Sequence, residues 1–241
     1  MSIDRPLEGR LALITGASRG LGWAAAKAYA KAGADLILLA RTVGALEELD
    51  DAIVAEGGKS STLVPLDLKD GDGIDRLGGA IAERWGRLDI LVSNAGVLGT
   101  LSPVGHIKPK SWDELMAVNV TANFRLIRSM DALLRVSSAG RAIFVTSGAA
   151  AKGEAFWGGY ASSKAALEAL VRAYAAEVGD ITRMRVNLLS PGPVDTGMRA
   201  KAFPGEDRST LPRPADLAPL FVELARAEET RNGQVIRFTR D

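Results

Sequence analysis

The sequence of 241 residues has no cysteine and a single histidine, His106. The absence of cysteine excludes disulfides and thiolate metal sites, and one histidine cannot form a histidine-rich cluster, so we expect no metal centre. Apolar runs of membrane-spanning length are also lacking, and the first residues form no apolar signal region. We therefore expect a soluble, cytoplasmic protein with no membrane partner.

An excess of charge of one sign is missing as well. The chain has 30 basic and 29 acidic side chains, which leaves a formal net charge of +1. Bulk electrostatics therefore gives no reason to expect a nucleic-acid partner, and any anionic ligand must be bound by local groups. Because 47% of the residues are hydrophobic, the chain can build a sizeable core, and we expect one domain over residues 1–241.

Short apolar runs alternate with longer helical patterns along the chain. The runs predict strands over residues 11–15, 35–40, 61–66, 89–93, 142–146, 185–190 and 235–238. The intervening patterns predict helices near residues 20–32, 43–56, 73–85, 112–134, 160–178 and 214–225. Unbroken apolar strands such as residues 36–39 are typical of a parallel sheet covered on both faces. The alternation predicts a doubly wound α/β fold, whose ligands bind beyond the carboxyl ends of the strands.

A glycine-rich turn, TGASRGLG at residues 15–22, follows the first predicted strand and opens a helix. Gly16 allows a sharp turn, Gly20 lets the backbone approach a pyrophosphate, and Gly22 permits tight contact between helix and sheet. The spacing differs from the common G-x-G-x-x-G pattern, and such a turn can also be only a tight connection. At the first strand-to-helix junction of an alternating chain, we favour dinucleotide binding.

The end of the second predicted strand bears on the choice of cofactor. A site for NAD would have a carboxylate there to bind the ribose 2′-hydroxyl, but the chain has Arg41. The planar guanidinium of Arg41 suits a 2′-phosphate, and Arg19 in the glycine turn can flank it. Both arginines could instead be solvated surface charges. We favour NADP(H) over NAD(H).

Tyr160 and Lys164 are spaced so that, in a helix, phenol and ammonium share one face. A phenol has an unperturbed pKa of about 10 and needs nearby positive charge to exchange protons at neutral pH. Ser147 would have to reach the same place from another element. An isolated Tyr-x-x-x-Lys is also compatible with an ordinary half-buried tyrosine and a solvated lysine. We place His106 on the surface, outside any mechanism.

These motifs occur in a set order. They are TGxxxGxG from Thr15, Ser93-Asn94-Ala95-Gly96, Asn119, Ser147, Tyr160-x-x-x-Lys164 and Pro191-Gly192-Pro193-Val194-Asp195-Thr196. In this order and spacing, over residues 9–236, the chain resembles the short-chain dehydrogenase/reductase family. The resemblance implies a Rossmann-type parallel sheet of seven strands with helices on both faces. It also implies an enzyme that moves hydride between NAD(P) and a carbonyl or alcohol.

The resemblance implies a role for each matching residue. Tyr160 matches the general acid–base of the family, and Lys164 matches the lysine that binds the nicotinamide ribose and lowers the pKa of the tyrosine. Ser147 matches the hydroxyl that polarises the substrate oxygen. Asn119 matches the residue that holds a water molecule in the proton relay. Asp67 resembles the acid that contacts adenine. The residues expected to bind the cofactor are Gly16, Ser18, Arg19, Gly20, Leu21, Gly22, Arg41, Asp67, Leu68, Asn94, Ala95, Gly96, Tyr160, Lys164, Pro191, Gly192, Val194 and Thr196.

The substrate side is less clearly patterned. Residues 197–214 lack periodicity and are predicted to be a substrate loop. Phe156, Trp157, Met198 and Phe203 could line an apolar cleft or could pack in the core or an interface. We favour a pocket for Met198 and Phe203, since a loop with polar flanks would otherwise expose them.

Two features depart from the family pattern. Ser93 replaces a frequent asparagine, a change not expected to remove activity, and the frequent glycine-rich extension after the last strand is missing. The second departure weakens the case for the most common tetrameric contact. We expect a homodimer or homotetramer, with a dimer through the helices that begin near Trp112 and Tyr160 favoured.

The expected function is NADP-dependent reduction of a carbonyl or oxidation of an alcohol. A ketone, a 3-oxoacyl thioester or a cyclic alcohol is the expected small-molecule substrate. A non-catalytic dinucleotide-binding or regulatory protein is the alternative, which the intact Ser147, Tyr160 and Lys164 disfavour. A redox-neutral epimerase or dehydratase is less expected, because such proteins usually add a substantial C-terminal substrate domain.

Overall fold

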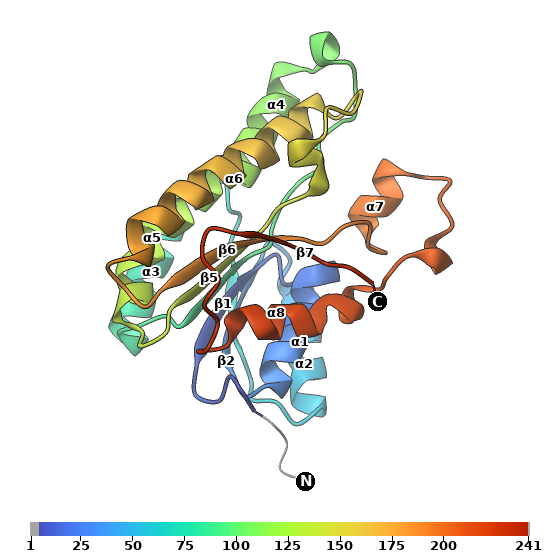
Figure 1. Ribbon diagram of the computed structural model, residues 1–241. Helices are drawn as coiled ribbons and strands as arrows, with labels where there is room; N and C mark the ends of the chain where they lie inside the picture. Colours follow the sequence, from blue (N-terminus) through green and yellow to red (C-terminus); the bar gives the residue numbers. More distant parts are fainter. Residues whose placement is uncertain (1–4, 241) are drawn as a thin grey trace.

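Seven parallel strands form one sheet in the order β3-β2-β1-β4-β5-β6-β7 in the computed structural model, which describes residues 5–240 (Figure 1). The strands are β1 (Leu11–Thr15), β2 (Asp35–Ala40), β3 (Thr62–Pro65), β4 (Ile90–Ser93), β5 (Arg141–Val145), β6 (Arg185–Ser190) and β7 (Val235–Arg237). From β1 the chain first moves outward to β2 and β3, then returns to β4 on the other side of β1. The expected doubly wound Rossmann-type fold is confirmed, and the strand order reverses between β1 and β4, where such sheets bind ligands.

Helices cover both faces of the sheet (Figure 1). One face carries α1 (Gly20–Lys31), α2 (Val43–Ala55) and α8 (Ala218–Ala225), and the other carries α3 (Gly71–Trp85), α5 (Ala122–Val136) and α6 (Gly158–Gly179). The short helix α4 (Pro109–Met116) packs against α6. Along β1, Ala12 and Ile14 pack in the first core cluster, whereas Leu11 and Leu13 pack in the second. Because successive strand residues point to opposite faces, two buried faces explain the unbroken apolar runs of the sequence.

The helix predicted over residues 112–134 is interrupted. The α-helix α4 ends at Met116, a wider π-helical turn, η2 (Ala117–Thr121), follows, and α5 begins at Ala122. Such turns often occur at functional sites, and this one buries Asn119. The prediction of one continuous helix was wrong here because apolar periodicity does not register a single widened turn.

The segment predicted as a loop over residues 197–214 is partly helical. It contains the short helix α7 (Gly197–Ala202) and the 3-10 turn η4 (Arg208–Thr210). Thr196 caps α7, because its hydroxyl oxygen accepts a hydrogen bond from the Arg199 N–H at 3.2 Å. A short 3-10 turn, η5 (Pro214–Leu217), then leads into α8.

His106 lies in another 3-10 turn, η1 (Val104–His106), and is exposed as expected. Across residues 5–240, none of the helices combines the length and the apolarity needed to cross a bilayer.

Two adjacent glycines of α3 give a test of this packing. A Cβ at Gly78 would lie 2.8 Å from the Ser129 carbonyl oxygen of α5, whereas a Cβ at Gly79 would meet no atom within 4 Å. We expect Gly79→Ala to stabilise the protein by roughly 0.5–1 kcal/mol, because alanine loses less backbone entropy in a helix. Gly78→Ala should destabilise it by about 1–3 kcal/mol through overpacking. Denaturant unfolding of both variants measures the difference, and shifts of the same sign would contradict the packing of α3 on α5.

Candidate active site

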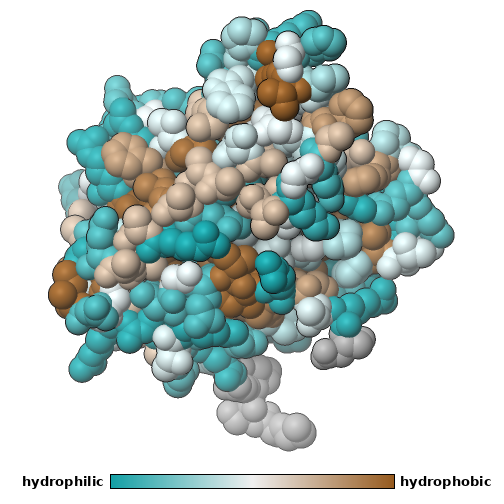
Figure 2. Space-filling view, turned by 45° about the horizontal axis from the view of Figure 1, so that its top comes forward, coloured by the Kyte–Doolittle hydropathy of each residue, from teal (hydrophilic) through white to brown (hydrophobic). Residues whose placement is uncertain are grey.

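A cleft of about 540 Å³ opens at the carboxyl ends of the strands, where their order reverses. Every residue predicted to bind cofactor or to act in catalysis lines it, except Gly22 and Asn119. The view turned toward this edge shows apolar side chains gathered across the middle of the face, with hydrophilic ones around them (Figure 2). The structure therefore brings together groups that lie as far apart in the sequence as Gly16 and Thr196.

The glycine turn lies directly against the end of β4. Gly16 has a positive φ of 66°, and a Cβ on Gly22 would lie 2.3 Å from the Gly16 carbonyl oxygen. The Asn94 side chain donates to the carbonyl oxygens of Thr15 and Gly16 at 3.0 and 3.2 Å, which fixes the turn. These contacts explain why Gly22 lies behind the cleft wall and why a larger residue does not fit there.

The start of α1 is suited to an anion. Arg19 is the N-cap residue, and its side chain makes no capping hydrogen bond, so the first N–H groups of the helix have no side-chain acceptor. Gly20 has a φ of 58°, and a Cβ there would approach nothing closer than 3.6 Å. The turn therefore leaves an open, positively polarised surface of the kind that binds pyrophosphate.

The cleft has more positive than negative side chains on its lining. Arg19 and Arg41 are exposed there, and neither forms an ion pair in the part of the chain that the structure describes. Asp67, after β3, is the one acidic side chain among the described lining residues, and its carboxylate accepts from the Lys69 N–H at 3.0 Å. Residues 5–240 contain no group of three or more His, Cys, Asp or Glu side chains that could hold a metal ion.

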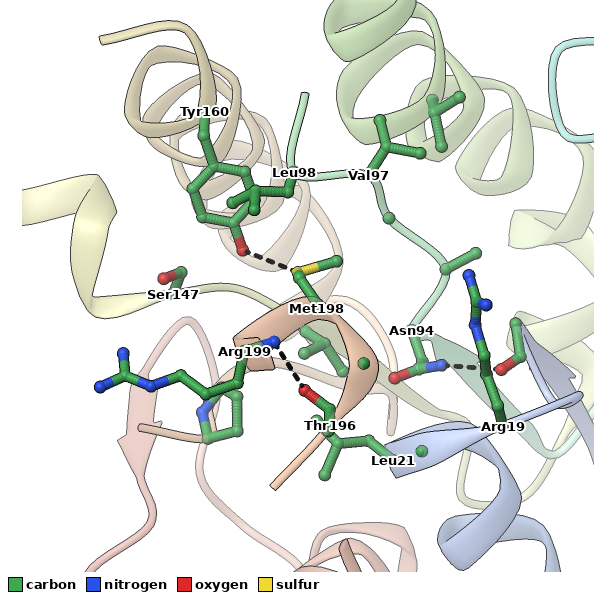
Figure 3. A pocket seen from close by; sticks show the side chains of 18 of the residues that line it. Arg19, Leu21, Asn94, Val97, Leu98, Ser147, Tyr160, Thr196, Met198 and Arg199 are labelled. Atoms are coloured by element: carbon green, nitrogen blue, oxygen red, sulfur yellow. Dashed lines mark hydrogen bonds between the residues drawn. The ribbon is translucent and has the colours of Figure 1, made fainter. Parts of the chain in front are cut away.

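Tyr160, Lys164 and Ser147 meet at the other end of the cleft. Tyr160 and Lys164 are both buried on α6 and line the cleft, as the four-residue spacing predicts. The Lys164 Nζ donates to the Val145 carbonyl oxygen at 2.8 Å and lies 6.0 Å from the centre of the Tyr160 ring. Ser147 follows β5, and Figure 3 shows it on the same side of the cleft as the Tyr160 hydroxyl.

Burial controls the proton affinities of these groups. Burial raises the pKa of Tyr160 above its usual value, and a hydrogen bond with Ser147 opposes the rise. Burial also lowers the pKa of Lys164 to about 8, while the charge of Glu168 opposes the fall. The lowering of the Tyr160 pKa that the resemblance implies is therefore not found, because burial outweighs the opposing hydrogen bond. A neutral phenol at pH 7 is in the form that donates a proton.

Asn119 is engaged with the protein rather than with the cleft. Its side-chain oxygen accepts from the Val97 N–H, and its Nδ2 donates to the Val97 carbonyl and to the Ser163 hydroxyl, each at 2.9 Å. The Asn119 carbonyl accepts from Asn123 Nδ2 at 2.9 Å, and Asn123 in turn accepts from the Ser93 hydroxyl at 2.6 Å. Asn119 thus joins η2 to the segment after β4 and to α6. Its role in holding a water stays a prediction.

The substrate side is bounded by apolar groups on two elements. The Tyr160 hydroxyl donates to Met198 Sδ on α7 at 3.9 Å (Figure 3), and the Trp157 ring packs edge-on against Tyr160 with centroids 5.9 Å apart. Met198 and Trp157 line the cleft. The expectation for Phe203 was wrong, because it is not among the lining residues and instead packs on Trp157 at 5.8 Å. Phe156 also lies outside the lining and is exposed.

Contacts of Arg199 stabilise α7 and the residues that follow it, and they were not predicted from the sequence. The Arg199 guanidinium lies over the Phe203 ring at 3.7 Å and donates through Nε to Glu206 at 2.6 Å. These two contacts tie the end of α7 to the residues that follow it, and the Phe203 ring packs on Trp157, just before α6. Asn123, Glu168 and Glu206 were likewise not foreseen, since each acts through a neighbour that only the folded chain brings close.

Comparisons with known proteins identify similar sequences. A family model described as short chain dehydrogenase matches residues 10–207. The uncharacterized oxidoreductase YciK of Escherichia coli strain K12 is 40% identical over 220 residues, which are 90% of this chain and 86% of YciK. A sorbitol dehydrogenase of Cereibacter sphaeroides is 34% identical over 92% of this chain and 88% of its own length.

Solved structures agree along nearly the whole chain. A protein of Escherichia coli CFT073 described as a short chain dehydrogenase, crystallised with NADPH, superposes with a TM-score of 0.93 and 38% identity over 97% of this chain and 98% of its own. A similar protein of Shigella flexneri, crystallised with NADP, has a TM-score of 0.93 and 37% identity over 97% of this chain and 98% of its own.

Proposed function

The chain belongs to the short-chain dehydrogenase/reductase family, and we propose that this oxidoreductase reduces the carbonyl group of a small, partly apolar molecule with NADPH, or oxidises the corresponding alcohol with NADP⁺. The observation that carries the proposal is the meeting of a glycine turn with Ser147, Tyr160 and Lys164 in one cleft. A ketone, a 3-oxoacyl thioester or a cyclic alcohol fits the apolar wall formed by Trp157 and Met198.

The residues of the cleft fit the proposed cofactor. The glycine turn and the uncapped start of α1 would hold the pyrophosphate. Arg41 and Arg19 would bind a 2′-phosphate, because both are exposed cations of the cleft without ion-pair partners among residues 5–240. The NADP- and NADPH-bound relatives support this choice.

When bound, the reduced nicotinamide supplies a hydride to the carbonyl carbon of the substrate. Negative charge then develops on the carbonyl oxygen, and the hydroxyls of Ser147 and Tyr160 donate hydrogen bonds to it. Tyr160 transfers its proton to that oxygen, and the nearby Lys164 ammonium stabilises the phenolate that remains. The Tyr160 hydroxyl donates to the Met198 thioether, a weak acceptor that a carbonyl oxygen can readily replace.

An NADPH-oxidation screen tests the proposal. Purified protein is mixed with NADPH and a panel of ketones, quinones, sugars and 3-oxoacyl thioesters, and the loss of NADPH absorbance is followed. We expect turnover with at least one carbonyl class. Tight NADPH binding without oxidation over the whole panel would favour the alternative of a non-catalytic dinucleotide-binding protein.

The charge at the end of β2 is expected to decide between the two nicotinamide cofactors. Arg41→Ala should lower kcat/KM for NADPH by roughly 10- to 100-fold, since a hydrogen bond to a charged group contributes about 1.5–3 kcal/mol. The efficiency with NADH should barely change, because NADH has no 2′-phosphate, and it serves as the internal control. Arg41→Asp should reverse the preference. Equal losses with both cofactors would contradict this assignment of Arg41.

We further propose that two copies associate through the faces of α4, α5 and α6. The proposal is supported by large apolar side chains that are exposed there, Trp112 on α4 (39%) and Phe124 on α5 (48%). Sedimentation of the protein and of a Phe124→Lys variant tests it, with a dimer expected for the first and a monomer for the second. A monomeric wild-type protein would contradict it.

A further inference from the structure

A buried carboxylate lies one helical turn beyond Lys164. Glu168 is on the same helix, α6, and is only 8% exposed. Its Oε1 accepts from the Thr146 hydroxyl at 2.9 Å, and its Oε2 accepts from Arg172 at 2.8 Å. Since residues four apart share one face of a helix, Lys164, Glu168 and Arg172 form a row of alternating charge from the cleft toward the surface.

The Thr146 contact connects this carboxylate to the catalytic end of β5. Thr146 is buried and stands between Val145, whose carbonyl accepts from Lys164, and Ser147. Thr146 is itself held by a backbone hydrogen bond from its N–H to the Leu189 carbonyl of β6 at 2.8 Å. The position of the Glu168 carboxylate is therefore fixed by two side chains on different elements, Thr146 and Arg172.

The other groups around Lys164 are neutral. The end of β5 contributes the Val145 carbonyl, and α6 contributes the Tyr160 ring. The turn η2 contributes the Asn119 amide: a Cβ on Gly96 would lie 3.3 Å from Asn119 Oδ1 and 3.5 Å from Lys164 Nζ. Within the described part of the chain, Glu168 is the one ionisable side chain whose charge acts appreciably on Lys164.

An ammonium in this position is costly without a counter-charge. Lys164 is 4% exposed, and removing an ammonium from water favours its neutral form. Burial does lower the pKa of Lys164, to about 8, and the Glu168 charge opposes that fall. Arg172 is half exposed, with 53% of its side chain accessible, so solvent screens only part of the attraction between its charge and the Glu168 carboxylate.

We propose that Glu168 is a positioning residue of the active site, which acts through Lys164 by keeping that side chain an ammonium at neutral pH. The inference rests on the proposed function, because the Lys164 charge serves the proton transfer by Tyr160. Without Glu168 the cleft would keep its shape, but the lysine would lose its proton at a lower pH.

The expected direction of the pH effect follows from this arrangement. Lys164 is charged below its pKa and neutral above it, so reductase activity should decline as the pH rises through about 8. In Glu168→Gln the lysine loses its counter-charge, and the decline should move to lower pH. Because the four-residue spacing places carboxylate and ammonium on one face of α6, we expect a displacement of about one pH unit, the lower end of the effect of a nearby opposite charge.

The experiment measures the titration of Lys164 directly as well as activity. The full-length, cofactor-free protein is labelled with ¹³C at lysine Cε, the Lys164 signal is assigned with Lys164→Met, and its shift is followed against pH by NMR. Glu168→Gln retains an oxygen that can accept from Thr146, and circular dichroism checks that the variant is folded. The pH profile of NADPH oxidation is recorded for the same proteins.

Two further variants control for the change. Glu177→Gln makes the same substitution on α6, farther from Lys164, and should leave its titration unchanged. Arg172→Gln removes the cation that pairs with the Glu168 carboxylate. More of the carboxylate charge then acts on Lys164, so the pKa of Lys164 should rise. The Lys164 titration in Arg172→Gln also keeps the inference testable if Glu168→Gln does not fold.

A downward displacement in Glu168→Gln, with none in Glu177→Gln, supports the inference. An unchanged Lys164 titration in both Glu168→Gln and Arg172→Gln overturns it. If the wild-type protein oxidises no NADPH but the Lys164 signal still moves as expected, the proposed function fails while the charge relation between Glu168 and Lys164 stands.

Discussion

Replacement of Tyr160 by phenylalanine is expected to lower kcat for carbonyl reduction by about 10³-fold, within the range of about 10²–10⁴ that positioned acid–base groups contribute. The substitution removes one hydroxyl from a buried ring, so the cleft should keep its shape and NADPH should bind nearly as tightly as before. Steady-state kinetics and a fluorescence titration with NADPH measure the two quantities separately. The variant should lose turnover and retain binding.

A second buried tyrosine on α6 provides the matched control. The Tyr174 hydroxyl donates to Asp131 at 2.8 Å, on the side of the helix that packs against α5, and does not line the cleft. Tyr174→Phe removes the same atom from the same helix and should lower the stability while leaving kcat close to that of the wild type. If the Tyr160 and Tyr174 variants lost activity to the same extent, the loss would be structural and Tyr160 would not be the proton donor.

Substitution of Gly22 by alanine should strongly weaken cofactor binding at the other end of the cleft. The added Cβ would lie 2.3 Å from the Gly16 carbonyl oxygen and 2.6 Å from Asn94 Nδ2. The Gly16 carbonyl is a backbone group and cannot move aside as a flexible side chain can, so the glycine turn must open to make room. Overpacking of this kind costs roughly 1–3 kcal/mol or more, and we expect the Kd for NADPH to rise by about 10- to 100-fold.

Calorimetric titration with NADPH, together with thermal unfolding, measures the effect of Gly22→Ala. Gly79→Ala is the control, because it adds the same atom to a helix at a place with no neighbour within 4 Å. It should leave the Kd for NADPH unchanged. A Gly22→Ala variant that binds NADPH like the wild type would show that the close approach of α1 to the glycine turn is not needed for binding.

Much of the fold could be predicted from the sequence because the sheet is buried on both faces. Residues 36–39 are apolar without interruption, and the structure places them in β2 with alternating side chains in two separate cores. The bounds of β1, β2 and β6 were predicted without error. The widened turn η2 was missed, because it depends on hydrogen bonds between Asn119 and residues that are distant in the sequence.

The parts of the site that are formed by short sequence motifs could be predicted. The spacing of Tyr160 and Lys164 gave their common helix face, and the glycine turn gave the start of α1. The electrostatics could not be predicted in the same way. The direction of the Tyr160 pKa depends on how deeply the ring is buried, and the counter-charge of Lys164 depends on Glu168, an ordinary helix residue in the sequence.

The substrate side shows the same limit. The segment around α7 is held by contacts of Arg199 with Phe203 and Glu206 and by the packing of Phe203 on Trp157, which the sequence pattern does not indicate. Phe203 was expected in the pocket because an exposed apolar residue is unfavourable, but its ring contacts Trp157 and the Arg199 guanidinium instead and stays 37% exposed. An apolar side chain in this segment therefore does not by itself indicate a substrate pocket.

The most direct test of the central claim is a crystal structure of the protein with NADP⁺. The account predicts that the nicotinamide ring lies beside the Tyr160 hydroxyl and Ser147, with Lys164 at the adjoining ribose and the 2′-phosphate against Arg41. A dinucleotide bound away from Tyr160, or a Tyr160 and Lys164 pair turned away from the nicotinamide, would contradict it.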